Sequence, residues 1–320
     1  MDLRQLRYFC QVVESGSFSK AADILHVAQP ALSQHVRRME DELGVALLHR
    51  TPHGVTTTEA GDRLLRHAKR IISEFSELPD QVRGALVAPR GEVRFGMPAT
   101  IGELLAVPLI EAAKERYPEV RIRIVEAMSG YVLGWLRRGD LDLAILYGTS
   151  DPGGLASHHG LSEEIRLFAS SSIPQEPSLN GDVARLSALG TLPVIIPGRG
   201  HGLRELVEEA ILERGKAFVP AIEIDSYTQI KRLVARGLGY GILPHMAIDR
   251  EVETGVFRMW RFEEPRITRR LYLTYSTERP LLTAPRAIGQ LAWEILRNLV
   301  AEGLWIGELS DDEQDPRLYP

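Results

Sequence analysis

The sequence predicts an α/β protein that begins with a small helical domain. Three observations support this fold class. Residues 1–58 hold short amphipathic segments and a hairpin pattern, residues 59–87 form one long helical pattern, and from residue 92 the pattern alternates between strand and helix. A chain of 320 residues is long for one domain, so we expect two or three compact units.

The composition is that of a soluble globular protein, with 44% hydrophobic and 25% charged residues. A lone cysteine, Cys10, lies in an apolar helical pattern, which excludes a disulfide framework and favours a buried core residue over a reactive thiol. The first residues are charged and amphipathic without a cleavable apolar stretch, and no run is long enough to span a bilayer. We therefore expect a cytoplasmic protein.

The helical head has recognisable helix boundaries. Apolar spacing predicts a first helix over 2–14, and Ser17 or Ser19 opens a second. Pro30 belongs in the first turn of a third helix, where its missing N–H costs nothing, and Gly44 ends that helix.

The third helix divides into two faces. Its apolar residues recur at helical spacing and predict a buried stripe: Leu32, Val36, Met39 and Leu43. Its polar residues form a contiguous neighbouring face that we expect to point outward: Gln29, Ser33, Gln34 and Arg37. Such a face is better suited to hydrogen bonding with a polar partner than to packing in a core.

After the third helix, two β-prone runs over 45–50 and 55–57 flank a Pro/Gly turn, which predicts a small hairpin. This hairpin would form a wing. The second and third helices, the wing and the long trailing helix together make a winged helix-turn-helix. The net charge of −5 argues weakly against nucleic acid, but residues 1–70 hold ten Lys/Arg against eight Asp/Glu. A mildly basic N-terminal region followed by an acidic remainder of the chain is compatible with local phosphate contact.

The body predicts parallel α/β sheets beyond a hinge at 88–91. The predicted strands are 92–97, 120–127, 141–147, 192–196, 221–224, 239–244 and 270–276. The predicted helices are 102–116, 131–138, 201–214, 227–236 and 284–300. The last strand and helix come late enough to return to the first subdomain. Residues 306–320 are predicted to be a disordered tail.

The stretch AADILHVAQPALSQHVRRMEDELGVALLHRTPHGVTTTEAG resembles the helix-turn-helix and wing of LysR-type transcriptional regulators, and the resemblance extends over essentially the whole chain. It implies a bacterial DNA-binding regulator, either repressor or activator. It also implies an effector domain of two α/β subdomains similar to periplasmic binding proteins. The implied boundaries are a winged helix-turn-helix over 1–58, a dimerising linker helix over 59–87, effector subdomain I over 92–161 and 267–305, and subdomain II over 162–266.

Two further stretches, IIPGRGHGLRELVEEAILERG and EIDSYTQIKRLVARGLGYGILP, resemble the branch containing nitrogen assimilation control regulators. The family resemblance implies promoter DNA and a small-molecule effector as partners. It also implies a homodimer through the linker helix and a tetramer formed from two dimers, with no membrane partner and no cofactor. We expect effector-induced closure of the two subdomains to change promoter bending, because one long helix and a short hinge join sensor to reader.

Carried over by position, the third helix enters the major groove and its readers are Gln29, Ser33, Gln34 and Arg37. Gln suits the N6/N7 edge of adenine, and Arg suits the O6/N7 edge of guanine. Pro30 would set the helix start against a phosphate. The residues expected to contact phosphates and position the domain are Ser19, Lys20, Arg50 and Thr56.

The effector site is expected at the carboxyl ends of the body's strands. Thr100 lies where the first strand passes into a helix, and in the family this position often holds an effector carboxylate, so the effector is expected to be anionic. The other candidates at strand ends and in loops are Ser129, Tyr147, Gly148, Arg199 and His201.

Two other readings are weaker. For an enzyme or metal protein, His158 and His159 match no helical metal motif and lie in a stretch that looks like an exposed loop, so no metal site is expected. Residues 237–241 lack the setting of a dinucleotide fingerprint and read as a turn into a strand. A small-molecule binding protein of the periplasmic type without a DNA role is the better rival, and the winged helix argues against it.

Overall fold

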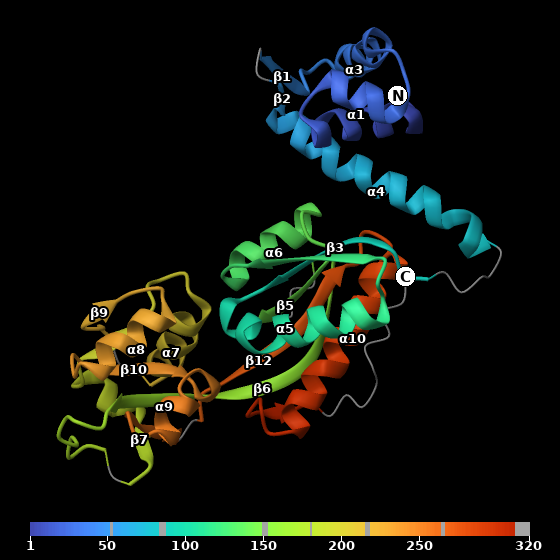
Figure 1. Cartoon of the computed structure of the whole chain (residues 1–320). Coiled ribbons are helices and arrows are strands. Elements are labelled where there is room, and N and C mark those ends of the chain that lie inside the picture. Colours follow the sequence, from blue (N-terminus) through green and yellow to red (C-terminus); the bar gives the residue numbers. More distant parts are fainter. Residues whose placement is uncertain are drawn as a thin grey trace. The chain divides into compact units, whose positions relative to one another are not determined.

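A computed structural model describes residues 1–51, 54–82, 88–148, 153–179, 181–214, 218–263 and 266–310 (Figure 1). Contacts divide the chain into two compact units. We call Met1–Ala88 the N-terminal unit and Pro89–Pro320 the α/β unit. Within the described residues, none of the helices has both the length and the apolar character needed to cross a membrane.

The N-terminal unit is a winged helix-turn-helix, as predicted. Its elements are α1 (Leu3–Ser15), α2 (Phe18–Leu25), α3 (Gln29–Leu43), β1 (Leu48–Thr51), β2 (Gly54–Thr57) and α4 (Glu59–Val82). Asp2 caps α1 through a reciprocal bond pair with Gln5, and Ser17, not Ser19, caps α2. Gly16 and Gly44 end α1 and α3 at positive φ, where glycine avoids a steric penalty.

The apolar stripe of α3 is confirmed except at its end. Leu32, Val36 and Met39 are fully buried in the core of the N-terminal unit. Leu43 is 42% exposed, so its predicted burial is wrong. It is the last residue of α3; the chain turns at Gly44, and Leu47 is buried instead.

The α/β unit contains a mixed sheet rather than the purely parallel sheets predicted. Strands β3 (Gly91–Met97), β4 (Val120–Glu126) and β5 (Leu143–Tyr147) are parallel. Beside β5, strand β12 (Thr268–Ser276) runs antiparallel to both β5 and β6 (Leu155–Ser170). Helices α5 (Ala99–Arg116) and α10 (Thr283–Ala301) pack against each other over β3 and β4.

The second half of the α/β unit is built on the far end of β6. It comprises β7 (Val183–Arg185), β8 (Val194–Ile196), α7 (Gly202–Leu212), β9 (Ile222–Glu223), α8 (Tyr227–Ala235), β10 (Tyr240–Pro244), α9 (Asp249–Glu253) and β11 (Phe257–Glu263). Short 3-10 turns cover Leu186–Gly190 and His245–Ala247. Here β8, β9 and β10 are parallel, whereas β10 and β11 lie antiparallel to β6.

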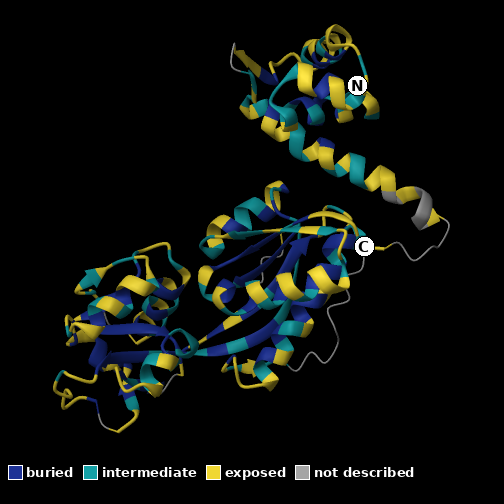
Figure 2. Ribbon diagram, viewed as in Figure 1, coloured by how far each residue is buried: buried dark blue, intermediate teal, exposed yellow. Residues whose placement is uncertain are grey.

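Each half has its own buried core. We call lobe I the half around β3, β4, β5, α5, α10 and α6 (Ser129–Arg138), and lobe II the half around β8, β10, α7 and α8. Figure 2 shows the central strands of both lobes as buried. Strand β5 is buried on both faces: Leu143 and Ile145 join the core beneath α5, and Ala144 and Leu146 join the cluster beneath α6. Its continuous apolar run is typical of such a strand.

Strand β6 was missed, and the interpretation of His158 and His159 as part of an exposed loop is wrong. Both histidines lie in β6 at intermediate burial and pack against Tyr275 and Tyr272 of β12. Because residues 155–160 contain no Val, Ile, Thr, Tyr, Phe or Trp, local sequence did not reveal a strand that pairing with distant β12 holds in place.

The tail prediction is wrong at its start. Glu308–Leu309 forms β13, which pairs with β6, while residues 311–320 lie outside the described residues. The same C-terminal segment buries Trp305, whose Nε1 donates to Glu163 Oε2 at 3.1 Å. Glu163 in turn forms an ion pair with its neighbour on β12, Arg269. The side chain of Glu163 is 2% exposed and that of Arg269 is 7% exposed. This buried pair therefore joins β6 and β12, the two strands that connect the lobes.

Replacing Glu163 by Gln is expected to lower the free energy of unfolding by about 3–5 kcal/mol, because Arg269 would remain buried with an uncompensated charge. Urea denaturation followed by circular dichroism measures the change. The double variant Glu163→Gln/Arg269→Met removes both charges and should lose less than the single variant. A single variant within about 0.5 kcal/mol of wild type, the usual range for surface changes, would contradict this account.

Candidate functional sites

The polar face of α3 is available to solvent. Gln29, Gln34 and Arg37 are exposed on the face beside the buried stripe, and Pro30 lies in the first turn. Ser33 is half-buried because its Oγ accepts a hydrogen bond from Arg50 Nη1 at 3.0 Å. The residues predicted to read bases therefore share one surface, with Ser33 already tied to the wing.

Arg50 is held at the base of the wing by three contacts. Besides bonding Ser33, it pairs with Glu40 at 3.2 Å and lies 4.8 Å from the Phe18 ring centroid. Glu40 Oε1 also accepts the backbone N–H groups of Leu47 and Leu48, at 2.9 and 3.2 Å. Glu40, which sequence reasoning did not single out, thus fastens α3 to the wing and offsets part of the charge of Arg50.

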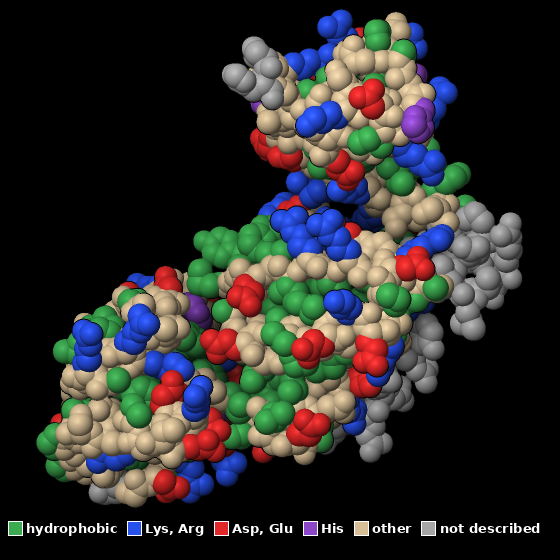
Figure 3. Space-filling view, viewed as in Figure 1, with side chains coloured by type: hydrophobic (Ala, Val, Ile, Leu, Met, Phe, Trp, Pro, Cys, Tyr) green, Lys and Arg blue, Asp and Glu red, His purple; other side chains and the backbone are tan. Residues whose placement is uncertain are grey.

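The other residues predicted to contact phosphates are all exposed. Ser19 and Lys20 lie in the first turn of α2, and Thr56 lies on β2. Figure 3 shows further Lys and Arg side chains on the visible surface of the N-terminal unit. These positions can reach a phosphate backbone without rearranging the core.

The α/β unit has a cavity of about 970 Å³ between its lobes. Five of the six predicted effector residues line it, namely Thr100, Ser129, Tyr147, Gly148 and His201. Arg199 is exposed and does not line the cavity. Helices α5, α6, α7 and α8 all begin at lining residues, so their N-terminal backbone donors meet there.

Lobe I contributes a hydroxyl network. Thr100 Oγ1 and Tyr147 Oη lie 3.3 Å apart, and Ser129 Oγ accepts the backbone N–H of Tyr147 at 3.3 Å. Burial raises the pKa of Tyr147, so the phenol is neutral at physiological pH and able to donate a hydrogen bond.

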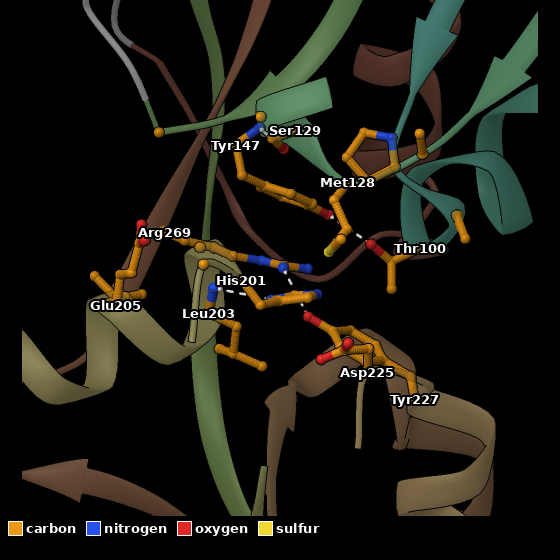
Figure 4. A pocket seen from close by; sticks show the side chains of 18 of the residues that line it. Thr100, Met128, Ser129, Tyr147, His201, Leu203, Glu205, Asp225, Tyr227 and Arg269 are labelled. Carbon is orange, nitrogen blue, oxygen red and sulfur yellow. Dashed lines mark hydrogen bonds between the residues drawn. The ribbon is translucent and has the colours of Figure 1, made fainter. Parts of the chain in front are cut away.

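Arg269 is the main cavity residue that sequence reasoning missed. Its guanidinium lies 3.4 Å from the centroid of the Tyr147 ring, and Nη1 donates to Tyr227 Oη at 3.4 Å. Nη2 is buried and has no hydrogen-bond partner among the described residues. Figure 4 shows Arg269 extending toward Tyr147 and His201 in the middle of the cavity. Burial opposes its charge, but Glu163 keeps the pKa of Arg269 above its usual value.

His201 comes from lobe II and caps α7, where its Nδ1 accepts the N–H of Leu203 at 3.2 Å. Its ring lies 5.6 Å from that of Tyr227. Burial, followed by the charge of Arg269, lowers the pKa of His201, so the imidazole is neutral at neutral pH. The other charged lining residues are Arg270, Glu103, Glu126, Glu205, Glu209 and Asp225.

A winged helix with an exposed polar recognition helix, followed by a two-lobed unit with a polar cavity between its lobes, defines a ligand-responsive DNA-binding regulator. Two family models match the chain. Residues 3–62 match the bacterial regulatory helix-turn-helix protein, lysR family, and residues 88–297 match the LysR substrate binding domain. The chain belongs to the LysR family of transcriptional regulators.

Individual relatives agree with this family. The nitrogen assimilation regulatory protein nac of Klebsiella aerogenes is 33% identical over 302 residues, covering 94% of this chain and 96% of its own. A cysteine mutant of Corynebacterium glutamicum OxyR is 26% identical with a TM-score of 0.66, over 94% of both chains. A full-length cysteine-to-aspartate variant of Pseudomonas aeruginosa OxyR is 25% identical with a TM-score of 0.70, over 93% and 95%.

Those OxyR structures carry substitutions at cysteines, whereas the 320 residues of this chain contain one cysteine. Cys10 is buried in the N-terminal unit, as predicted. A disulfide needs two thiols, so none can form within this chain. Burial, reinforced by Glu14, also raises the pKa of Cys10 to about 11, so almost no thiolate exists at neutral pH.

We expect Cys10 of the native protein to react with Ellman's reagent more than about 100-fold more slowly than the urea-unfolded chain, in which the thiol pKa returns to about 8.5. Stopped-flow absorbance at mildly alkaline pH measures both rates. Rapid stoichiometric reaction of the native chain would show that the thiol is accessible and ionised.

Proposed function

We propose that this protein binds specific promoter DNA through α3 and adjusts transcription when a small molecule occupies the cavity between lobes I and II. The observation that carries the proposal is the division of α3. Leu32, Val36 and Met39 are buried, while Gln29, Gln34 and Arg37 are exposed together on a helix that begins with Pro30. The exposed side chains can form two-pronged hydrogen bonds with base edges in the major groove.

The remaining DNA contacts are proposed to position the domain. Lys20 and Thr56 are exposed and suited to phosphate contact, whereas Arg50 is partly neutralised by Glu40. We propose that Arg50 acts chiefly by holding the wing against α3, and that it reaches a phosphate with the part of its guanidinium left open to solvent.

The proposed dimer forms through α4. The inner face of α4 packs on the N-terminal core through Leu64, Leu65, Ala68 and Ile72. A second apolar stripe lies outside it: Ile71, Phe75, Leu78 and Val82 are 46, 54, 50 and 78% exposed and recur at i, i+4, i+7 and i+11. This spacing suits a partner helix. We propose that dimers pair into tetramers, and that the protein acts in the cytoplasm, where promoter DNA lies.

The proposed signal is a change in the angle between the lobes. Strands β6 and β12 run from one lobe to the other, and the cavity draws residues from both, so a ligand that binds both walls favours a closed form. We propose that closure is passed through α4 to the paired winged helices and alters promoter bending. The division into subdomains at 161/162 and 266/267 stays a prediction.

The rival reading, a small-molecule binding protein without a DNA role, accounts for the cavity only. It gives no reason for a winged helix with an exposed polar face. An enzyme is not favoured either, because the cavity's His201 has its Nδ1 occupied as a helix cap and no nucleophile–base pair stands out among the described lining residues.

Substituting Arg37 by Ala is expected to weaken binding to promoter DNA by about 1–3 kcal/mol and to relax the preference at one base pair. Gel-shift titrations over a salt series, using DNA fragments that the wild-type protein selects from a genomic library, measure both effects. The control, Arg236→Ala, removes an equal charge from the exposed end of α8 and should change neither.

If the wild-type protein binds DNA without sequence preference, the proposed function fails. If it binds specifically but Arg37→Ala binds equally well, α3 does not read the bases as proposed.

Replacing Phe75 by Glu is expected to raise the dimer dissociation constant by more than about tenfold, because the interface would bury an unpaired carboxylate. Sedimentation equilibrium measures the shift toward monomer. The control, Glu74→Ala, changes an exposed neighbour that lies off the stripe and should leave the association unchanged. Unaltered association of Phe75→Glu would place the dimer interface elsewhere.

A further inference from the structure

The charge of the cavity differs from what an anionic effector requires. Glu103 on α5 and Glu126 at the end of β4 lie on the lobe I wall. Glu205 and Glu209 on α7, with Asp225 just before α8, lie on the lobe II wall. All five carboxylates are exposed to the cavity or its mouth, and none forms an ion pair with another described residue. Figure 4 shows Glu205 and Asp225 among the lining side chains.

The positive groups do not balance these carboxylates. Arg269 and Arg270 are the Lys or Arg residues among the described lining residues, and Arg269 is already neutralised by buried Glu163. His201 is neutral near pH 7, for the reasons given above. The cavity therefore has a net negative charge, which raises the local concentration of cations and repels anions.

The centre of the cavity has the opposite preference. Arg269 is nine-tenths buried and its Nη2 has no hydrogen-bond partner among the described residues. The first turn of α5, with the hydroxyl of Thr100, lies on the same side as Tyr147, whose ring Arg269 covers. A buried donor without a partner is costly, so an acceptor such as a carboxylate is favoured here.

We propose that the effector carries a protonated amine or guanidine group together with a hydrogen-bond acceptor such as a carboxylate. The acceptor lies against Arg269 and Thr100, and the cation lies between Glu103 and Glu126 on one wall and Glu205, Glu209 and Asp225 on the other. The proposal rests on the cavity being the effector site. It replaces the purely anionic effector predicted from the sequence, which took account of Thr100 and the helix starts but not of carboxylates brought together from distant segments.

The same arrangement supplies a means of regulation. Carboxylates on opposite walls repel one another and favour an open cavity in the absence of ligand. A cationic group between the walls removes that repulsion and attracts both, so it favours closure by binding the closed form better than the open one.

Three probes with the same five-carbon chain test the proposal: glutarate, 5-aminopentanoate and 1,5-diaminopentane. Isothermal titration of each into the full-length protein should show 5-aminopentanoate binding at least about tenfold more tightly than glutarate. The diamine shows how much the cationic end contributes alone, and it should also bind more tightly than glutarate. Glutarate binding as tightly as either amine, or no measurable binding of both amines, would overturn the proposal.

Charge-removing variants locate the binding. Glu103→Gln and Glu205→Gln each remove one carboxylate from opposite walls and should weaken 5-aminopentanoate by about tenfold without weakening glutarate. Glu111→Gln is the matched control, because Glu111 is exposed on the same helix as Glu103 but lies outside the cavity. Equal affinities in all three variants would overturn the proposal.

Gel-shift assays with the wild-type protein separate this proposal from the proposed function. Specific DNA binding that glutarate changes and the amines do not would retain the regulator and reject the cationic effector. If the wild-type protein shows no sequence-specific DNA binding in the absence of ligand, the proposed regulator itself is rejected.

Discussion

The ion pair between Glu163 and Arg269 lies where the C-terminal segment, the paired strands β6 and β12 and the cavity meet. It lies where β6 and β12 are paired, on the two strands that connect the lobes. Trp305 Nε1 donates to Glu163 Oε2, and the guanidinium of Arg269, the other member of the pair, lies over the Tyr147 ring in the cavity. One buried charge pair therefore links the C-terminal segment, the connection between the lobes and the centre of the ligand cavity. A ligand that bonds Arg269, as proposed, would act directly on that connection.

The cavity combines donors at its centre with carboxylates on its walls. Four helices begin at its lining, because each helix follows a strand whose carboxyl end faces the gap between the lobes. The acidic side chains come from α5, from α7 (where Glu205 lies in the first turn), from the end of β4 and from the loop after β9. For the proposed effector, selection would depend on both ends of the molecule, and closure would depend on a cationic group that both walls attract.

In the N-terminal unit, α3 combines a buried apolar stripe with an exposed polar face. Buried residues of α3 supply the packing, while its polar side chains stay exposed on a neighbouring face. Glu40 on α3 accepts three hydrogen bonds, from the side chain of Arg50 and from the backbone N–H groups of Leu47 and Leu48. These contacts, with the hydrogen bond between Arg50 and Ser33, fix the polar face of α3 relative to the wing.

The sequence alone predicted the winged helix-turn-helix, the family, and most of the helices and parallel strands. Of the six effector residues that it predicted, five line the cavity. These features depend on local patterns: apolar periodicity, capping residues, and strand-to-helix transitions. Only the tertiary structure decided that β6 is a long antiparallel strand, that Leu43 is exposed, that Arg199 lies outside the cavity and that Arg269 and five carboxylates lie within it. The pairing of β6 with β12 and the set of residues that line the cavity depend on segments distant in sequence being brought together, as Glu163 is with Arg269, and no local pattern encodes such a pairing.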